Sequence, residues 1–334
     1  MNSYLIVGGG GMIGQKIAAM LDGEADSIPG GTELALFDLA VPDRSGISAG
    51  AILGSLDDDE VISKLAATRP DTVFQLAAIL SGESERDFDK GWRINLFANW
   101  KLLEALRREH VKSGSKYRPR FVFASSAAVY GPPIDGAVDD LRICEPQTSY
   151  GAQKVAAELM VSDFSRKGFI DGISLRLPTI TVRPGKPNAA ASSCFSAIIR
   201  EPLNGRRTAL PLSTDVRHMH ASPRSAARFF LHAARLNTDR LDGRRALNMP
   251  SITCSVEEQI EALRSVAGNK AVSLIDMKPD PFIQSIIASW AEEFRTDRAR
   301  ALGFEVETSF DEVVQVYIED DLPGEPGSPH VKPS

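Results

Sequence analysis

Short apolar runs alternate with longer amphipathic runs along the first 180 residues of the chain. A short apolar run is typical of a buried strand, whereas apolar positions that recur every three or four residues mark one face of a helix. The strands predicted in this way are Tyr4–Val7, Glu33–Phe37, Thr72–Leu76, Arg120–Ala124 and Gly172–Leu177. The helices predicted in this way are Gly11–Leu21, Asp58–Thr68, Phe88–His110 and Tyr150–Lys167. This alternation predicts an α/β fold with a mostly parallel, doubly wound sheet that helices cover on both faces.

The pattern changes after Pro178. Helices are predicted at Phe195–Leu203, Pro223–Leu236, Val256–Val266, Phe282–Phe294 and Phe310–Glu319, with a short strand at Thr208–Leu212. No further strand–helix–strand crossover is evident, so we predict a sheet domain at 1–180 and a smaller α+β region at 181–322 that binds substrate, from which some segments can return to the sheet. The Pro-, Gly- and Ser-rich tail at 323–334 is predicted to be disordered.

Composition excludes several classes of protein. The formal charge of −6 argues against a nucleic-acid-binding surface, which would be basic. Apolar runs stay shorter than the roughly 18 residues of a membrane span, and the N-terminus lacks the basic start of a signal peptide. The three cysteines, Cys144, Cys194 and Cys254, fit reduced cytosolic thiols better than a disulfide framework. His218 and His220 share one side of a possible strand but lack a third ligand, so we predict a cytoplasmic protein without a metal site.

A glycine-rich stretch, Gly8–Gly14, follows the first strand and opens the first helix. It contains both Gly9-x-Gly11-x-x-Gly14 and Gly8-x-x-Gly11-x-x-Gly14. Glycine is needed here because backbone N–H groups must approach a pyrophosphate without an intervening Cβ, at the positive end of the helix. The strand–turn–helix context predicts a Rossmann-type dinucleotide site rather than a flexible glycine hairpin.

Asp38 ends the second strand, 24 residues after Gly14. A carboxylate at this place accepts hydrogen bonds from the adenosine ribose and repels a 2′-phosphate. The residues that follow it are apolar and include no arginine, so the sequence favours NAD over NADP. The alternative is that Asp38 only caps a loop.

A tyrosine and a lysine, Tyr150 and Lys154, stand four residues apart on a predicted helix and therefore share one face. The ammonium beside the phenol favours the phenolate, which can serve as a general base. Ser126 ends an apolar strand, where ligands bind in open α/β sheets, and its hydroxyl can hold a substrate alcohol. Asn95 lies within the preceding long helix, where its amide can orient water or backbone. Tyr150 and Lys154 by themselves could also form a solvated helix face.

These motifs together resemble the extended short-chain dehydrogenase/reductases of the NAD-dependent epimerase/dehydratase type, over nearly the whole chain. The resemblance implies that Tyr150 is the acid/base, that Ser126 orients the substrate, that Lys154 binds the nicotinamide ribose and tunes the tyrosine, and that Asn95 supports a proton relay. It implies an NAD site that also includes Gly8, Gly11, Met12, Ile13, Gly14, Asp38, Ser55, Leu56, Leu76, Ala77, Ala78, Pro178, Thr179 and Ile180.

Two stretches depart from the pattern of the family. Ser55-Leu56 stands where relatives often carry an aspartate against adenine, so the adenine contact would use a hydroxyl or backbone. Arg217–Arg224 keeps the arginine and one histidine of the sugar-nucleotide epimerases but lacks their acidic residues. A nucleotide-sugar epimerase or dehydratase is thereby less favoured, and it stays an alternative, as does a non-catalytic NAD-binding protein.

Further stretches resemble a subgroup that oxidises C2 of the four-carbon sugar acid D-erythronate with NAD, among them Arg176–Thr179 and Val182–Ser193. An arginine fork suits a carboxylate, and hydroxyl or amide side chains suit the substrate hydroxyls. The candidate substrate residues are Ser81, Ser126, Tyr150, Arg183, Lys186, Asn188, Ser192 and Arg217. The cations could instead be solvated, and Ser192 could cap the next helix.

The sequence leaves the stereochemistry of the sugar acid open, because D-erythronate and L-threonate differ only in the position of a hydroxyl. The family resemblance also implies a homodimer, formed through the long helices Phe88–His110 and Tyr150–Lys167. A small sugar acid is the only partner molecule that the motifs predict, with no nucleic acid and no membrane.

Overall fold

The structure is a computed structural model of the chain, and it describes residues 2–24, 31–42, 48–185 and 191–322. Two candidate substrate residues, Lys186 and Asn188, lie outside the described residues, and so does the tail at 323–334.

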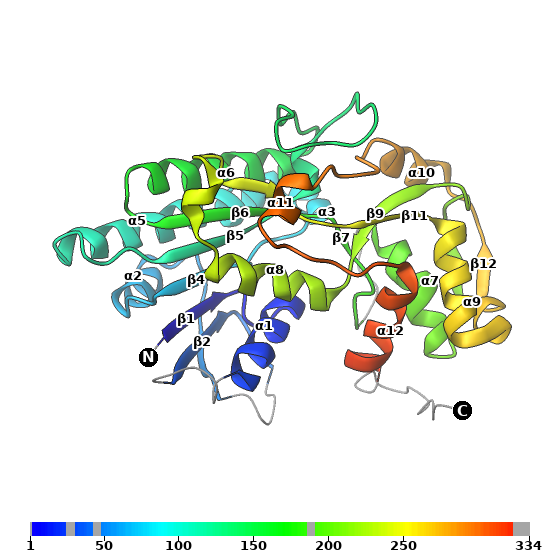
Figure 1. Cartoon of the computed structure of the whole chain (residues 1–334), viewed down its shortest axis with the longest axis horizontal. Coiled ribbons are helices and arrows are strands. Elements are labelled where there is room, and N and C mark those ends of the chain that lie inside the picture. The colour runs from blue at the N-terminus through cyan, green and yellow to red at the C-terminus, as the bar shows by residue number, and fades with distance from the viewer. Residues whose placement is uncertain (1, 25–30, 43–47, 186–190, 323–334) are drawn as a thin grey trace.

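A parallel sheet forms the centre of the molecule (Figure 1). Within the described residues it has seven strands in the order β10-β6-β5-β4-β1-β2-β3, and every neighbouring pair is parallel. These strands are β1 (Asn2–Val7), β2 (Thr32–Asp38), β3 (Gly50–Leu53), β4 (Thr72–Gln75), β5 (Arg120–Ser126), β6 (Asp171–Leu177) and β10 (Ala246–Asn248). The strand order reverses between β1 and β4, and such a reversal places ligands at the carboxyl ends of the strands. The predicted doubly wound sheet is confirmed.

Helices cover both faces of this sheet. On one face, α1 (Met12–Gly23) and α8 (Pro223–Arg235) bury Ile17, Leu21, Phe229 and Phe230 against the strands. The other face carries α2 (Asp59–Ala67), α5 (Ala98–Lys112) and α6 (Ser149–Arg166), which contribute to a second apolar cluster. Each buried aliphatic or aromatic side chain stabilises the fold by about 2 kcal/mol, so the two clusters fix the sheet between its helices.

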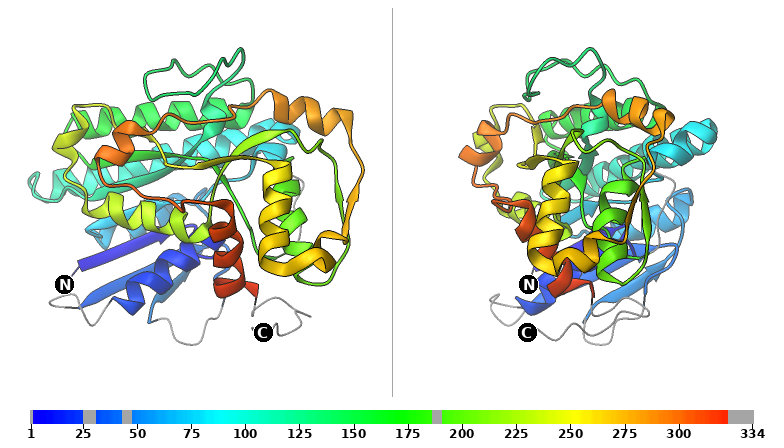
Figure 2. Two further views of the ribbon diagram at one scale, coloured as in Figure 1. Left: turned by 45° about the vertical axis from the view of Figure 1, so that its right-hand side comes forward. Right: turned by 90° about the vertical axis from the view of Figure 1, so that its right-hand side faces the viewer.

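The C-terminal part has a core of its own (Figure 2). It contains α7 (Ser193–Leu203), α9 (Val256–Val272), α10 (Pro281–Ala288) and α12 (Phe310–Asp320). In the described residues, β11 (Ile252–Ser255), β9 (Arg217–Ala221) and β7 (Thr179–Ile180) form one small sheet, and β12 (Ile275–Met277) pairs with β8 (Thr208–Leu210).

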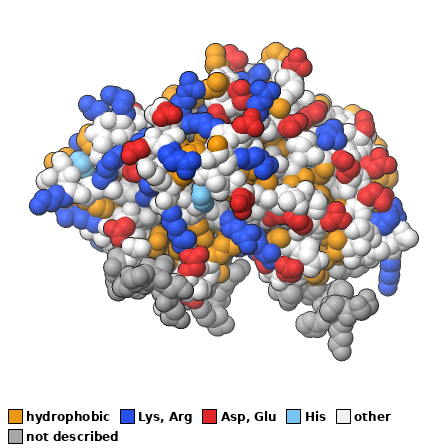
Figure 3. Space-filling model, in the orientation of Figure 1, with side chains coloured by type: hydrophobic (Ala, Val, Ile, Leu, Met, Phe, Trp, Pro, Cys, Tyr) orange, Lys and Arg blue, Asp and Glu red, His pale blue; other side chains and the backbone are white. Residues whose placement is uncertain are grey.

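Figure 3 shows acidic and basic side chains interspersed over one face of the molecule. Ion pairs from Lys16 of α1 and Arg224 of α8 to Asp320 attach α12 to the sheet domain.

The structure refines or corrects the sequence predictions in three places. No further crossover was evident after Pro178, yet α8 packs on α1 and β10 pairs with β6. A segment of 181–322 therefore returns to the central sheet, which the prediction had allowed. The predicted helix Phe282–Phe294 ends at Ala288, since the backbone of Glu293 and Arg295 bonds to Val138 instead of continuing the helix. The strands β3, β10, β11 and β12 were not predicted, because they are three or four residues long and their apolar pattern is weak.

The predicted long helix Phe88–His110 is divided into consecutive pieces. They are α4 (Phe88–Trp92), a π-helical turn (Arg93–Phe97) and α5. An extra short helix, α3 (Ser81–Arg86), precedes them. π turns are rare and occur often at functional sites, and this one contains Asn95.

Candidate active site

The glycine turn between β1 and α1 owes its shape to missing side chains. Gly8 has φ of 90°, and a Cβ there would lie 2.7 Å from the Ala77 nitrogen. A Cβ on Gly14 would lie 2.5 Å from the Gly8 carbonyl oxygen. At Gly11 a Cβ would contact only the Gly8 carbonyl oxygen, at 3.3 Å. The rest of the space around it, next to the first residue of α1, is open. The first two glycines let the chain pack, and Gly11 keeps the start of the helix open.

The start of α1 is suited to bind an anion. Its N-cap, Gly11, has no side chain to cap the helix, and the first turn contains no acidic residue. The N–H groups of Met12, Ile13 and Gly14 therefore lack the side-chain acceptor that Thr148 supplies to α6. Free N–H groups and the positive end of the helix dipole are the features that bind a pyrophosphate.

Asp38 lies directly against the glycine turn. Its Oδ2 accepts a hydrogen bond from the Gly10 N–H at 2.9 Å, and its Oδ1 accepts from the Leu39 N–H at 2.7 Å. Ser55 follows β3 at the same edge, where the Gly54 N–H donates to the Asp38 carbonyl at 3.1 Å, and Leu56 is buried behind it. A helix start for pyrophosphate and a carboxylate for ribose fit the adenosine half of NAD.

The proton-transfer residues come together where α6 packs on the end of β5. Tyr150 and Lys154 face β5 from the first turns of α6, and Ser126 ends β5. The Lys154 Nζ donates to the Ala124 carbonyl at 2.8 Å and lies 5.4 Å from the centre of the Tyr150 ring. The Ser126 hydroxyl hydrogen-bonds to Tyr150. Ser126 from β5 and Lys154 from α6 thus lie close to the Tyr150 side chain.

Burial shifts the proton affinities of this group. It raises the pKa of Tyr150 to about 12, and the Ser126 hydroxyl acts in the opposite direction by stabilising the phenolate. Burial lowers the pKa of Lys154 to about 8, and the negative charge of Glu158 opposes that fall. The two shifts move the two pKa values apart, so Lys154 loses its proton at a lower pH than Tyr150 does. Titratable neighbours whose pKa values are pushed apart are typical of sites that exchange protons.

Asn95 connects the segment after β4 to α6. It is completely buried, and its Oδ1 accepts from the Ile79 N–H at 2.9 Å. Its Nδ2 lies within hydrogen-bond distance of the Ile79 carbonyl, the Ser84 hydroxyl and, at 2.8 Å, the Gln153 Oε1. Because Gln153 directly precedes Lys154, Asn95 ties the segment after β4 to the part of α6 that carries Lys154.

The segments expected beside the nicotinamide also lie at this edge. The N–H groups of Leu76 and Ala77 both donate to the Val7 carbonyl, at 2.8 and 3.1 Å, so the segment that continues to Ala78 passes the glycine turn. On the other side, Pro178 and Ile180 are buried.

Thr179 lies between those two residues and contacts a histidine. Its Oγ1 lies 2.7 Å from the Nε2 of His218 in β9. Burial lowers the pKa of His218 to about 4, so this ring is neutral at neutral pH and fixes the hydroxyl by a hydrogen bond.

The candidate substrate residues lie in different places. Ser81 begins α3, after β4. Arg183 is half-buried, and its Nη2 donates to the Ser192 hydroxyl at 2.9 Å, so these two predicted residues do come together. Ser192 precedes α7 but makes no side-chain capping hydrogen bond to it. Arg217 is exposed at the start of β9 and pairs with Glu258 at 3.3 Å.

Comparisons with known proteins agree with this geometry. The model of the NAD dependent epimerase/dehydratase family matches residues 4–239. The chain belongs to this family. It is therefore an enzyme of an NAD-dependent family, and NAD is its cofactor.

Two curated members of the family are similar to the chain over nearly their whole length. A D-erythronate dehydrogenase of Cupriavidus necator is 40% identical over 327 residues, covering 95% of this chain and 98% of that protein. A D-erythronate dehydrogenase of Haemophilus influenzae is 36% identical over 320 residues, covering 95% and 99%. The crystal structure of a nucleoside-diphosphate-sugar epimerase from Agrobacterium tumefaciens matches with a TM-score of 0.91 at 46% identity, covering 97% of this chain and 95% of that chain.

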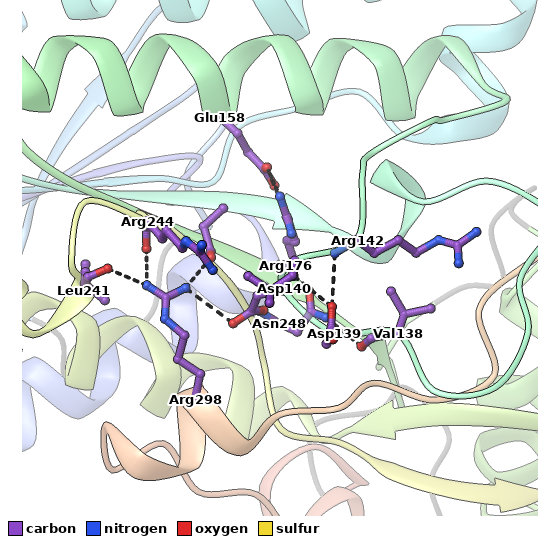
Figure 4. A network of polar contacts seen from close by, with 12 residues as sticks. Val138, Asp139, Asp140, Arg142, Glu158, Arg176, Leu241, Arg244, Asn248 and Arg298 are labelled. Carbon is purple, nitrogen blue, oxygen red and sulfur yellow. Dashed lines mark hydrogen bonds and ion pairs between the residues drawn. The ribbon is translucent and has the colours of Figure 1, made fainter.

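A buried polar network holds α6 against the ends of the central strands (Figure 4). Glu158 of α6 forms an ion pair with Arg176 of β6, with Nη2 to Oε2 at 2.7 Å. The Oε1 of Glu158 also accepts from the Ser125 hydroxyl at 2.5 Å. Arg176 Nη1 donates to the Tyr130 hydroxyl at 2.7 Å, which donates in turn to Asn248 Oδ1 at 2.8 Å. The network joins α6 to three strand ends, β5, β6 and β10.

The same network holds the segment between Ser126 and Tyr150. Asn248 donates from its backbone to Asp140 at 2.6 Å and from its side chain to the Val138 carbonyl at 3.0 Å. Arg298 approaches Asp140 from α11 (Asp297–Ala301) at 3.5 Å, as Figure 4 shows. This attachment fixes the segment that joins Ser126 to Tyr150.

Residues of the network were missed by the sequence analysis, although one signal was available. Glu158 follows Lys154 by four residues, as Lys154 follows Tyr150, so the three share one helical face. A charged residue on a face expected to be buried requires a partner, and Arg176 stands between two leucines near the end of the strand β6.

No helix of the described residues is long and apolar enough to cross a membrane. Nor do three or more His, Cys, Asp or Glu side chains of the described residues gather as a metal site. His220, like His218, contacts a threonine, with its Nδ1 3.1 Å from the Thr181 Oγ1.

Proposed function

We propose that the chain is a dehydrogenase that oxidises the C2 hydroxyl of D-erythronate to 2-oxo-erythronate with NAD. The observation that carries the proposal is the arrangement of Tyr150, Lys154 and Ser126 at the end of β5, beside a turn that fits a dinucleotide. Two D-erythronate dehydrogenases that are 40% and 36% identical over nearly the whole chain support the choice of substrate.

The chemistry assigned to the chain is removal of the C2 hydroxyl proton. Tyr150 as phenolate accepts that proton, and Ser126 holds the same oxygen by a hydrogen bond. Lys154 stabilises the phenolate by its charge and binds the nicotinamide ribose. When bound, NAD supplies the acceptor for the C2 hydride. The proton leaves the site by way of Lys154, with Asn95 fixing the position of the helix that carries it.

The cofactor would lie along the carboxyl edge of the sheet. Its pyrophosphate would bind at Gly11–Gly14, and its ribose at Asp38. The adenine would contact Ser55 and Leu56, and the nicotinamide end would lie between two segments. These segments are Leu76, Ala77 and Ala78 on one side and Pro178, Thr179 and Ile180 on the other.

The substrate hydroxyls would be met by residues from both sides of the site. Ser81 starts α3 beside β4, and Ser192 precedes α7 in the C-terminal part. The predicted roles of Lys186 and Asn188 stay proposals for residues outside the described part of the chain. Arg217 is the weakest candidate, since it is exposed and already paired with Glu258.

The decisive experiment follows NADH absorbance while the purified protein is offered NAD and a panel of four-carbon sugar acids. D-erythronate should give the highest kcat/KM, and L-threonate and the other stereoisomers should give less. Tyr150→Phe is the matched control, and it should bind NAD without producing NADH. Higher kcat/KM for another stereoisomer would reassign the substrate, and no NADH with any acid would reject the dehydrogenase.

A second function has one observation in its favour, the 46% identity to a structure described as a nucleoside-diphosphate-sugar epimerase. Such an enzyme would hold NAD and return the hydride to the sugar. Incubation with UDP-sugars should leave their stereochemistry unchanged by NMR if the dehydrogenase is correct. NAD binding without turnover of any acid or sugar nucleotide would instead favour a non-catalytic role.

We also propose a homodimer in the cytoplasm. The outer sides of α5 and α6 expose Trp100 and Leu159, with 48% and 66% of their surface accessible, and Phe97 is exposed nearby. A second copy of the chain would cover this apolar surface. Light scattering should give twice the mass of the 36.2 kDa chain, and Trp100→Glu should give one chain mass.

A further inference from the structure

Arg183 lies along one face of α7 and is held there at three points. Ser192, Ser196 and Arg200 follow one another at intervals of four residues, so they share that face. Arg183 Nη2 donates to the Ser192 hydroxyl at 2.9 Å, and the Arg183 N–H donates to the Ser196 hydroxyl at 3.1 Å. Arg200 Nη1 donates to the Arg183 carbonyl at 2.8 Å. The two arginines therefore belong to one structural unit.

Arg200 is a deeply buried cation with an unused donor. Only 2% of its side chain is accessible, and its Nε donates to Glu201 Oε1 at 2.7 Å. Its Nη2 is buried and has no hydrogen-bond partner. A buried guanidinium nitrogen without an acceptor costs free energy, and a ligand oxygen that accepted its hydrogen bond would recover that cost.

The positive charges of this unit exceed its negative charges. Glu201 is shared by Arg200 and Arg206, with N–O distances of 2.7 and 2.6 Å. Arg183 forms no salt bridge with any residue that the structure describes. Burial and the neighbouring Arg200 both lower the pKa of Arg183, which reflects the cost of holding two cations together away from water.

The helix itself adds to the positive potential. α7 is 11 residues long, its N-cap Ser192 makes no side-chain hydrogen bond to it, and its first turn has no acidic residue. Arg183 follows three residues after Ile180, the last residue of β7, so it lies close in the chain to the segment proposed to contact the nicotinamide.

We propose that Arg183 and Arg200 together bind the carboxylate of a small monocarboxylic acid, which under the proposed function is the C1 carboxylate of the sugar acid. Arg200 Nη2 donates to one carboxylate oxygen, and the Arg183 guanidinium donates to the other. Two planar guanidinium groups match a carboxylate better than a lysine would. Arg200 was not among the substrate residues predicted from the sequence, and its contact with Arg183 brings it into the site.

Binding is measured by calorimetry on the NADH-loaded protein, so that no turnover is needed. The probes are D-erythronate, its neutral amide D-erythronamide, and inorganic phosphate. Arg183→Met and Arg200→Met should each weaken D-erythronate binding about 10- to 100-fold, because each loses a hydrogen bond to a charged group. Binding of the amide should change less than about threefold. The matched control is Arg207→Met, an exposed arginine paired with Asp276, which should bind like the wild type.

Several outcomes distinguish this inference from the proposed function. Arginine-dependent binding of D-erythronate without NADH formation would reject the dehydrogenase and keep the carboxylate site. Unchanged D-erythronate binding in both variants, equal losses for acid and amide, or tighter binding of phosphate would overturn the site. Arg183→Lys and Arg200→Lys serve if a methionine variant does not fold. Each keeps its charge, loses the planar fork and should still weaken acid binding more than amide binding.

Discussion

Glu158 and Arg176 form a buried bidentate ion pair one helical turn beyond Lys154. The Arg176 Nε and Nη2 donate to the two carboxylate oxygens at 3.0 and 2.7 Å, and both side chains are at least 93% buried. The pair also contacts the end of β5, because the Ser125 hydroxyl donates to Glu158. Glu158 therefore has two effects: it neutralises the buried Arg176, and its negative charge raises the pKa of Lys154.

Replacing Glu158 by Gln should reduce stability and alter the pH profile. Removing one partner of a buried pair costs about 3–5 kcal/mol, because the other charge is left uncompensated. Since Glu158 raises the pKa of Lys154, its loss should lower that pKa further, and activity at high pH should fall off earlier. Urea unfolding and kcat/KM against pH measure the two effects. Ser125→Ala keeps the charge, so an equal pH shift in that control would contradict the electrostatic explanation.

Tyr150→Phe should reduce kcat by about 10²- to 10⁴-fold, which is the usual contribution of a general base. The phenyl ring preserves the packing of α6, so the Kd for NADH should stay within about threefold of wild type. NADH fluorescence titration and initial rates measure the two quantities. Turnover close to that of the wild type would mean that another group accepts the proton.

Lys154 should set the pH range of the reaction. Its pKa of about 8 means that the ammonium is present below that pH and is lost above it, whereas Tyr150, with a pKa near 12, must be deprotonated to act. In Lys154→Met, the rise of kcat/KM should move to higher pH, because the phenolate loses its neighbouring cation. Lys154→Arg keeps a permanent charge and should retain the wild-type rise. Identical profiles for all three proteins would exclude an electrostatic role for Lys154.

Asp38→Ala should change the preference between cofactors. The carboxylate beside Gly10 would bind the ribose hydroxyls of NAD and repel the 2′-phosphate of NADP. We expect kcat/KM for NAD to fall about tenfold or more and the NADP/NAD ratio to rise. The alternative role, a loop cap, predicts lower thermal stability with an unchanged ratio, so melting curves of the variant are the control.

His218 and His220 should make the fold sensitive to acid. Burial lowers the pKa of His218 to about 4 and that of His220 well below its usual value, so both are neutral in the folded chain. The unfolded chain takes up their protons below about pH 6.5, so stability is lost as the pH falls from 6.5. His218 accounts for about 2 kcal/mol of this loss between pH 6.5 and 5, and His220 acts in the same direction. His218→Gln should unfold in urea with a smaller difference between pH 7.5 and 5, and an unchanged difference would refute the assignment.

Motifs that depend on neighbouring residues were predictable from the sequence. The alternating pattern predicted the central strands, and the spacing of Gly8, Gly11 and Gly14 predicted the turn that the structure contains. Tyr150 and Lys154 share a face because four residues are about one helical turn. Ser126 required one more step, the rule that ligands bind at the carboxyl ends of parallel strands.

Features that depend on residues far apart in the chain were not predictable. β10 joins the sheet 69 positions after β6 ends, because α8 covers the sheet and returns the chain to its edge. Similarly, the helix at Pro281–Ala288 stops where the following backbone bonds to Val138.

The sequence by itself determined the fold class, the cofactor turn and the residue types of the proton transfer, because each rests on local periodicity or short spacing. Only the tertiary structure decided which cations are buried. Arg183 and Arg217 look equivalent in the sequence, yet one lies against Arg200 and the other is paired at the surface with Glu258. The difference arises because burial depends on how α7 and β9 pack, and a side chain's neighbours in space are not its neighbours along the chain.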